Sequence, residues 1–135
     1  MTLTEFLAGR LDEDEAAAKA ATGHLSGRWH IDGDGNVQDE DTGGGGNAYV
    51  ACGPYECGVD EADAAHILRH DPARVLREVE AGRKILGQCV HSLSYKRPVP
   101  AGKRGEWALA SLVAEALALP YADHPDYDEA VRVLT

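Results

Sequence analysis

The segment of residues 106–119, EWALASLVAEALAL, restricts the fold more than any other part of the sequence. Its apolar residues fall on more than one face of a helix, and only Glu106, Ser111 and Glu115 are clearly polar. A helix at the surface of a small protein normally has a single apolar face. This segment must therefore be covered on two sides, either as the central helix of the fold or by a second copy of the chain.

Few large apolar residues are available to cover it. Of the 135 residues, 21 are alanine and only 27 are Leu, Ile, Val or Phe. That content is close to the level below which chains do not fold alone. We therefore expect a thin, alanine-rich core and a homodimer, formed through this helix or through an exposed sheet edge.

Apolar residues at helical spacing, together with capping residues, predict four helices. Thr2 and Glu5 form a capping-box pattern that opens the first of them. Asp60 and the pair Asp71-Pro72 are typical of the starts of the second and third. The predicted helices span residues 3–21, 61–69, 72–87 and 106–119.

Between the first two helices the pattern changes to short apolar stretches broken by Gly, Asn and Asp, which indicates hairpins. Strands are predicted near residues 28–31, 36–39 and 47–52, with DGDGN as the first turn and glycines 43–46 as a loop. The expected fold class is thus α+β, with about four helices packed on a small antiparallel sheet.

A single domain of residues 1–135 is predicted, in four regions. These are an N-terminal helix (1–21), a hairpin region with the glycine-rich loop (28–58), a helical part (60–119) and a C-terminal strap (120–135). The strap contains Pro120 and Pro125, so we expect it to be extended, with Tyr121 and Tyr127 as its anchors.

The acidic residues are concentrated in the first half of the chain. Residues 1–63 contain 14 acidic and three basic residues, whereas residues 64–135 contain nine and ten, and the net charge is −10. An acidic surface repels phosphate backbones and attracts basic partners. Nucleic-acid binding is therefore disfavoured.

A cytoplasmic location is expected. The N-terminus lacks the basic start and apolar stretch of a signal peptide, and no apolar run approaches the roughly 20 residues that span a bilayer. Three cysteines in such a setting indicate free thiols or metal ligands rather than disulfides.

Two sets of residues are candidate sites. Cys52, Cys57, Cys89 and His91 would supply three thiolates and one imidazole, the donors that a structural zinc favours. The alternative is that the cysteines are small buried apolar residues and that the histidine lies on the surface. No other cofactor is expected.

The second set consists of His66, His70, Asp123, His124 and Tyr127. Histidines four residues apart share a helix face, and Asp-His pairs can serve acid-base chemistry or ligand binding. The alternatives are a helix-end role for His70 and a packing role for the tyrosine.

Two segments, DAAHILRHDPARVLREVEAGRKIL at 63–86 and ALALPYADHPDYDEA at 116–130, resemble a family of small actinobacterial and actinophage proteins of unknown function. Members of that family often carry a cysteine-rich insert that suggests zinc. Residues 95–107 of this chain contain no cysteine, so it departs from the family there. The resemblance implies an origin in a phage or mobile element.

These observations favour a small, acidic, non-enzymatic interaction protein that binds a host protein through its acidic first half or through a groove between helices. Two alternatives remain open: a zinc-supported structural module, and a small ligand-binding protein or hydrolase that uses the histidine and aspartate residues.

Overall fold

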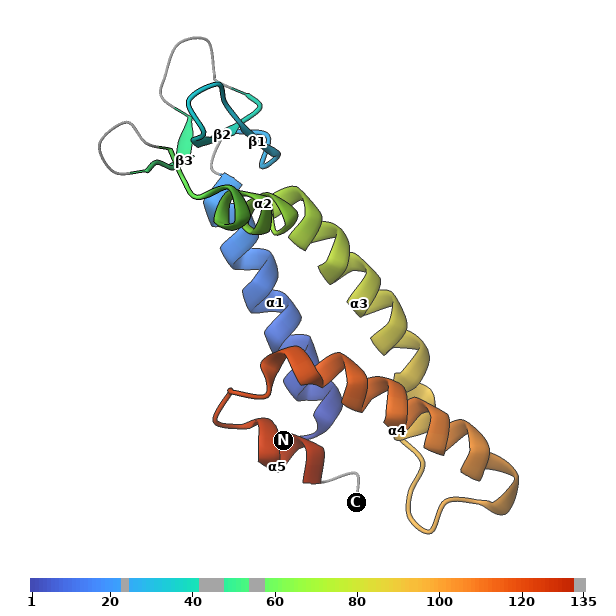
Figure 1. The fold of residues 1–135 in the computed structure, drawn as a ribbon. Coiled ribbons are helices and arrows are strands. Elements are labelled where there is room, and N and C mark those ends of the chain that lie inside the picture. The colour runs from blue at the N-terminus through green and yellow to red at the C-terminus, as the bar shows by residue number, and fades with distance from the viewer. Residues whose placement is uncertain (23–24, 42–47, 54–57, 133–135) are drawn as a thin grey trace. The chain divides into compact units, whose positions relative to one another are not determined.

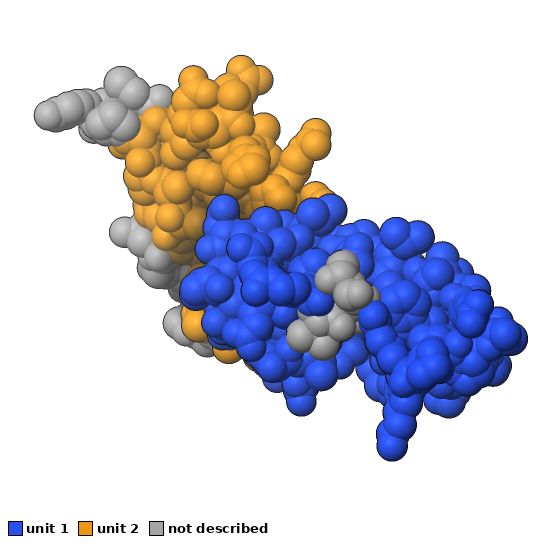
Figure 2. All heavy atoms as spheres, turned by 90° about the horizontal axis from the view of Figure 1, so that it is seen from below, with its two compact units in different colours: residues 1–13, 79–135 blue, residues 14–78 orange. Residues whose placement is uncertain are grey.

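The computed structural model describes residues 1–22, 25–41, 48–53 and 58–132 (Figure 1). Its internal contacts divide the chain into unit 1, residues 1–13 and 79–135, and unit 2, residues 14–78 (Figure 2). Two long helices pass from one unit into the other. Whether the chain is a single domain therefore stays a prediction.

The described residues form five α-helices, two short 3-10 helices and one three-stranded sheet, so the α+β class is confirmed. Four of the α-helices have more than six residues, in agreement with the expected number. The helices are α1 (Leu3–Thr22), α2 (Glu61–Arg69), α3 (Pro72–Leu93), η2 (Ala101–Lys103), α4 (Arg104–Ala118), η3 (Leu119–Tyr121) and α5 (Tyr127–Arg132). None of the helices in these ranges is long and apolar enough to cross a membrane.

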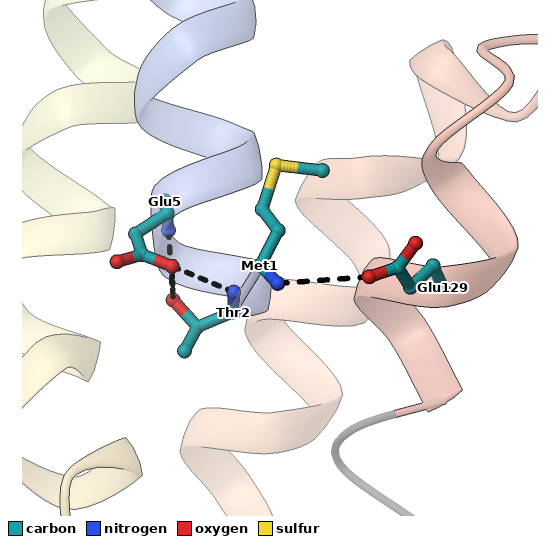
Figure 3. A network of polar contacts seen from close by, with 4 residues as sticks. All are labelled: Met1, Thr2, Glu5 and Glu129. Carbon is teal, nitrogen blue, oxygen red and sulfur yellow. Dashed lines mark hydrogen bonds and ion pairs between the residues drawn. The ribbon is translucent and has the colours of Figure 1, made fainter.

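The start of α1 is the capping box that its sequence predicts (Figure 3). The Thr2 backbone N–H donates to Glu5 Oε2 (2.7 Å), and the Glu5 N–H donates to Thr2 Oγ1 (3.2 Å). The Thr2 N–H bond, followed by a bond from the Thr2 hydroxyl to the same oxygen (Oγ1 to Oε2, 2.9 Å), lowers the pKa of the Glu5 carboxyl group. The Met1 amino group lies 3.7 Å from Glu129 Oε1, which places the N-terminus beside α5.

Helix α3 is longer than predicted and ends at Leu93 instead of residue 87. Leu86 and Cys89 are buried and Leu93 is half-buried, so the apolar spacing continues past the predicted end. Packing on that face outweighs the cost of Gly87 within the helix, which is about 1 kcal/mol.

The prediction of an extended C-terminal strap is wrong, because its described part forms η3 and α5. Pro120 lies at the start of the short helix η3, where a proline is tolerated because its missing N–H has no helical acceptor. The anchoring role of the tyrosines is confirmed: the rings of Tyr121 and Tyr127 each pack edge-on against Phe6, with centroids 6.3 Å apart.

The sheet belongs to unit 2 and is antiparallel, in the order β1 (Trp29–Ile31), β2 (Val37–Asp39), β3 (Tyr49–Ala51). The first hairpin pairs Trp29 with Asp39 and Ile31 with Val37. Its turn is the predicted DGDGN segment, in which Asp32 Oδ1 accepts two backbone N–H bonds of 2.9 Å. The glycines at 43–46 lie outside the described residues.

Alanine is prominent in the core, as its abundance in the sequence predicts. Seven of the 15 buried apolar residues that the structure describes are alanines. In unit 1 a Cβ on Gly82 would lie 3.0 Å from Leu11 Cδ2, so α1 and α3 pack closely there. The buried apolar residues of unit 1 are Leu3, Phe6, Leu7, Leu11, Val79, Leu86, Cys89, Ala110, Ala114, Ala118 and Ala130, and those of unit 2 are Ala18, Val37, Ala48 and Ala64.

Candidate functional site

Helix α4 carries two apolar stripes on opposite faces. Ala110, Ala114 and Ala118 are buried, with at most 7% of each residue exposed. The opposite stripe, here called the leucine stripe, is exposed, and Leu109, Leu112 and Leu119 are 65%, 65% and 63% accessible. The leucine stripe comprises Gly105, Leu109, Leu112, Ala116 and Leu119.

In most helices the large apolar side chains are buried and the small ones exposed, and α4 shows the reverse. Burying a leucine side chain stabilises the folded state by about 1.5–3 kcal/mol, far more than burying an alanine does. Yet the leucines of this stripe are exposed and the alanines of α4 are buried. Contiguous exposed apolar surfaces are a common feature of protein interaction sites. The sequence predicts that this helix is covered on two sides; the structure covers its alanine face, and a cover for the leucine stripe stays a prediction.

A groove of about 370 Å³ runs along one flank of the leucine stripe, between α3 and α4. Its floor includes the buried Cys89, and burial raises the pKa of that thiol. The groove is mainly apolar, with the exposed Ile85 on one wall. Its lining includes Ile85, Cys89, Ser92, Glu106, Leu109 and Val113.

A polar network joins the end of α3 to the start of α4. The Tyr95 hydroxyl lies 3.2 Å from His91 Nε2 and donates to Glu106 Oε2 (3.3 Å). Lys103 Nζ donates to Glu106 Oε1 (2.7 Å), and this bond raises the pKa of Lys103 and lowers that of Glu106. The network links the two ends of the segment at 94–103, which contains Lys96, Arg97 and Lys103.

Trp107 is half-buried beside this network. The guanidinium of Arg97 lies 4.8 Å from the centre of its ring, in a cation–π contact. A cavity of about 330 Å³ borders the tryptophan and is also lined by Thr2, Thr4, Ser94 and Tyr95.

Unit 2 presents carboxylates close to one end of its sheet. The Val59 N–H donates to the Gly35 carbonyl (2.9 Å), so the first hairpin turn lies against the segment that leads into α2. The exposed carboxylates of these two segments, here called the acidic surface, are Asp34, Asp60, Glu61 and Asp63. Asp32 adds a charge at the turn, because backbone hydrogen bonds, that of Asn36 first, lower its pKa.

The charges of the two units differ. Unit 2 contains 13 acidic and five basic residues, and unit 1 contains ten and eight. Ion pairs in unit 1 join Arg10 to Glu13, Arg83 to Asp12, Lys84 to Glu80 and Lys103 to Glu106. The acidic excess of the chain therefore belongs mainly to unit 2.

The four zinc candidates occupy different kinds of position. Cys52 is a free, exposed thiol after β3, whereas Cys89 is free and buried in α3. Cys89 and His91 are two residues apart on one helix, so their side chains project about 160° apart and do not converge on one ion. Cys57 lies outside the described residues, among which no group of three or more potential ligands lies together, and a zinc site stays a prediction.

The histidine and aspartate candidates are placed in separate units. His66 lies on α2 and His70 is the C-cap of that helix, with ring centroids 4.7 Å apart. His70 therefore has the predicted helix-end position. In unit 1, His124 packs edge-on against Phe6 at 5.4 Å, while Asp123 is exposed. A shared ligand-binding or hydrolytic role for these residues stays a prediction.

Comparison with known proteins gives a family but no activity. The model of a family of unknown function matches residues 1–133. The chain belongs to this family, DUF6221. No curated protein and no solved structure shows significant similarity to the chain. The function of this DUF6221 protein must therefore be inferred from its own surfaces.

Two features of this DUF6221 protein could not be read from the sequence. The network of His91, Tyr95 and Glu106 depends on the path of a loop that spacing does not define. The size reversal on α4 depends on which face the rest of unit 1 covers. The one sequence signal for the second feature was the apolar character of both faces of that helix.

Proposed function

We propose that the protein is a non-enzymatic binding protein whose acidic surface engages a basic surface of another protein in the cell. The observation that carries the proposal is the gathering of Asp34, Asp60, Glu61 and Asp63 on unit 2, where acidic residues outnumber basic ones by 13 to five. Opposed charges speed the encounter of two proteins and select against acidic partners.

A host protein is the proposed partner, and the cytoplasm the proposed location. The resemblance to actinobacterial and actinophage proteins supports an origin in a phage or mobile element. Small acidic proteins from such elements commonly act by binding components of the host. The acidic surface also supports the choice of a protein over a nucleic acid, because phosphate groups are repelled by carboxylates.

The test compares three forms of the full-length protein on a solid support in an actinobacterial lysate. One is the wild type, and the second is the triple variant Asp34→Asn, Glu61→Gln, Asp63→Asn, which leaves the helix cap Asp60 intact. The matched control, Glu13→Gln, Glu80→Gln, Asp128→Asn, removes the same number of exposed acidic groups from unit 1.

We expect the wild type and the control to retain a common protein of basic isoelectric point that the triple variant loses. Raising the salt concentration should release that protein, since salt screens charges over about 8 Å at physiological strength. Identical retention by all three forms would contradict the proposal, as would a retained set that consists of acidic proteins.

A further inference from the structure

The leucine stripe of α4 has the residue spacing of a helix-pairing surface. Its members, at positions 105, 109, 112, 116 and 119, are separated alternately by four and three residues. This alternation keeps side chains on one seam of a helix and is the pattern by which two helices interlock. Leu119 has helical backbone angles although it begins η3, so the seam continues to that residue.

The seam mixes large and small residues. Leu112 is followed by Ala116, and Leu109 and Leu119 lie outside this central pair. In an antiparallel pair centred between Leu112 and Ala116, each of these residues faces the other type on the second copy. Leu109 then faces Leu119 of the second copy. Opposing a large and a small side chain lets two helices approach closely without voids.

Charges at the two ends of the seam distinguish the orientations. Arg104 precedes it, next to a Lys103 that is already paired with Glu106, and Asp123 and Asp126 follow it in the sequence. A parallel pair brings equal charges together at both ends, whereas an antiparallel pair brings the basic end of one copy to the acidic end of the other. Antiparallel helix dipoles also attract each other.

We propose that two copies of this chain pair through the leucine stripes of their α4 helices in antiparallel orientation. The second copy covers leucines that the rest of unit 1 leaves 65%, 65% and 63% exposed. This explains why the larger residues of α4 are outside and its alanines inside. The pairing uses unit 1, so it is independent of the acidic surface of unit 2.

Sedimentation velocity over a concentration series tests the pairing with the full-length protein. We expect a species of twice the chain mass of 14.4 kDa that dissociates on dilution. Leu112→Glu should raise the dissociation constant at least tenfold, because it places two charges in the centre of the seam. Ala116→Leu should also raise the dissociation constant, because a leucine there is too large for the space opposite Leu112 of the second copy. This second variant tests the pairing even if Leu112→Glu folds poorly.

A matched control places the same charge on the sheet edge, the second surface through which the sequence predicts that copies could pair. Val50 in the edge strand β3 is 40% exposed, and Val50→Glu should leave the dissociation constant unchanged. If Val50→Glu abolishes the dimer and Leu112→Glu does not, the copies pair through the sheet edge and the proposal is wrong. A protein that stays monomeric at every concentration also overturns the proposal, and a different protein would then have to cover the leucine stripe.

The orientation has its own test. In the antiparallel pair, Arg104→Glu should weaken dimerisation, and adding Asp123→Arg to the same chain should restore it, because each end again meets the opposite charge. In a parallel pair the double variant regains nothing, since like charges still meet. Failure of the double variant to recover would therefore overturn the antiparallel arrangement.

Discussion

Asp39 is the residue on which the hairpin unit depends most directly. Only 1% of it is exposed, and its carboxylate accepts hydrogen bonds from Ser26 Oγ (2.6 Å) and from the backbone N–H groups of Gly27 (2.8 Å) and Asp41 (2.9 Å). Burial alone raises the pKa of this carboxyl group, but the hydrogen bonds, that of Ser26 first, outweigh burial and lower it. The folded state thus stabilises the charged carboxylate over the protonated carboxyl group.

Asp39→Asn should lower the free energy of unfolding by about 1–3 kcal/mol, because an amide nitrogen then faces donors that need an acceptor. Chemical denaturation measures the change. Asp34→Asn, at an exposed position of the same hairpin, is the control and should lower the free energy of unfolding by less than about 0.5 kcal/mol. An equal effect of the two substitutions would show that the buried hydrogen bonds contribute nothing.

The pH dependence follows from the direction of the same shift. A carboxyl group whose pKa is lower in the folded state stabilises the fold above its unfolded pKa of about 3.9 and loses this contribution as the pH falls through the folded value. The gap in stability between wild type and Asp39→Asn should therefore be widest near neutral pH and shrink below about pH 4. Denaturation curves across this range measure the gap, and a constant gap contradicts the assignment.

At the scale of elements, the sequence predicted where helices lie better than what each face contacts. Asp60 caps α2 as its position suggests, with Oδ1 accepting the Ala62 N–H at 2.9 Å, and the bounds of α2 agree with those predicted. Caps are local and can be read from neighbouring residues. The choice of α4 to bury Ala114 and expose Leu112 depends on distant segments, so helical spacing alone could not reveal it.

This reversal predicts an unusual pattern of mutational effects in α4. Ala114→Leu should lower the free energy of unfolding by about 1–3 kcal/mol, because Ala114 is fully buried and the added atoms have no space. Leu112→Ala should change it by less than about 0.5 kcal/mol in the monomer, where this side chain is exposed. Thermal unfolding at low protein concentration compares them, and a larger loss from Leu112→Ala would contradict the assigned faces.

At the scale of the whole molecule, the chain consists of two units that share the helices α1 and α3. The boundary falls after Glu13 in the first helix and after Glu78 in the second. Nothing in composition or spacing marks either position, because helical periodicity continues through both. A division that depends on long-range contacts is invisible to local sequence patterns, and the single domain that the sequence indicates stays a prediction.

Shared helices couple the stability of the units, since neither can unfold without fraying an element of the other. Each unit contains one tryptophan, Trp29 in β1 and Trp107 in α4. The variant Trp107→Phe therefore reports on unit 2 through Trp29, and Trp29→Phe reports on unit 1 through Trp107. We expect the two fluorescence transitions to coincide in denaturant, as in a two-state protein. Adding Asp39→Asn should then shift the transition reported by Trp107 as far as that reported by Trp29, although Asp39 belongs to unit 2. A shift confined to Trp29 would show that the units unfold separately and that the chain is two domains joined by continuous helices.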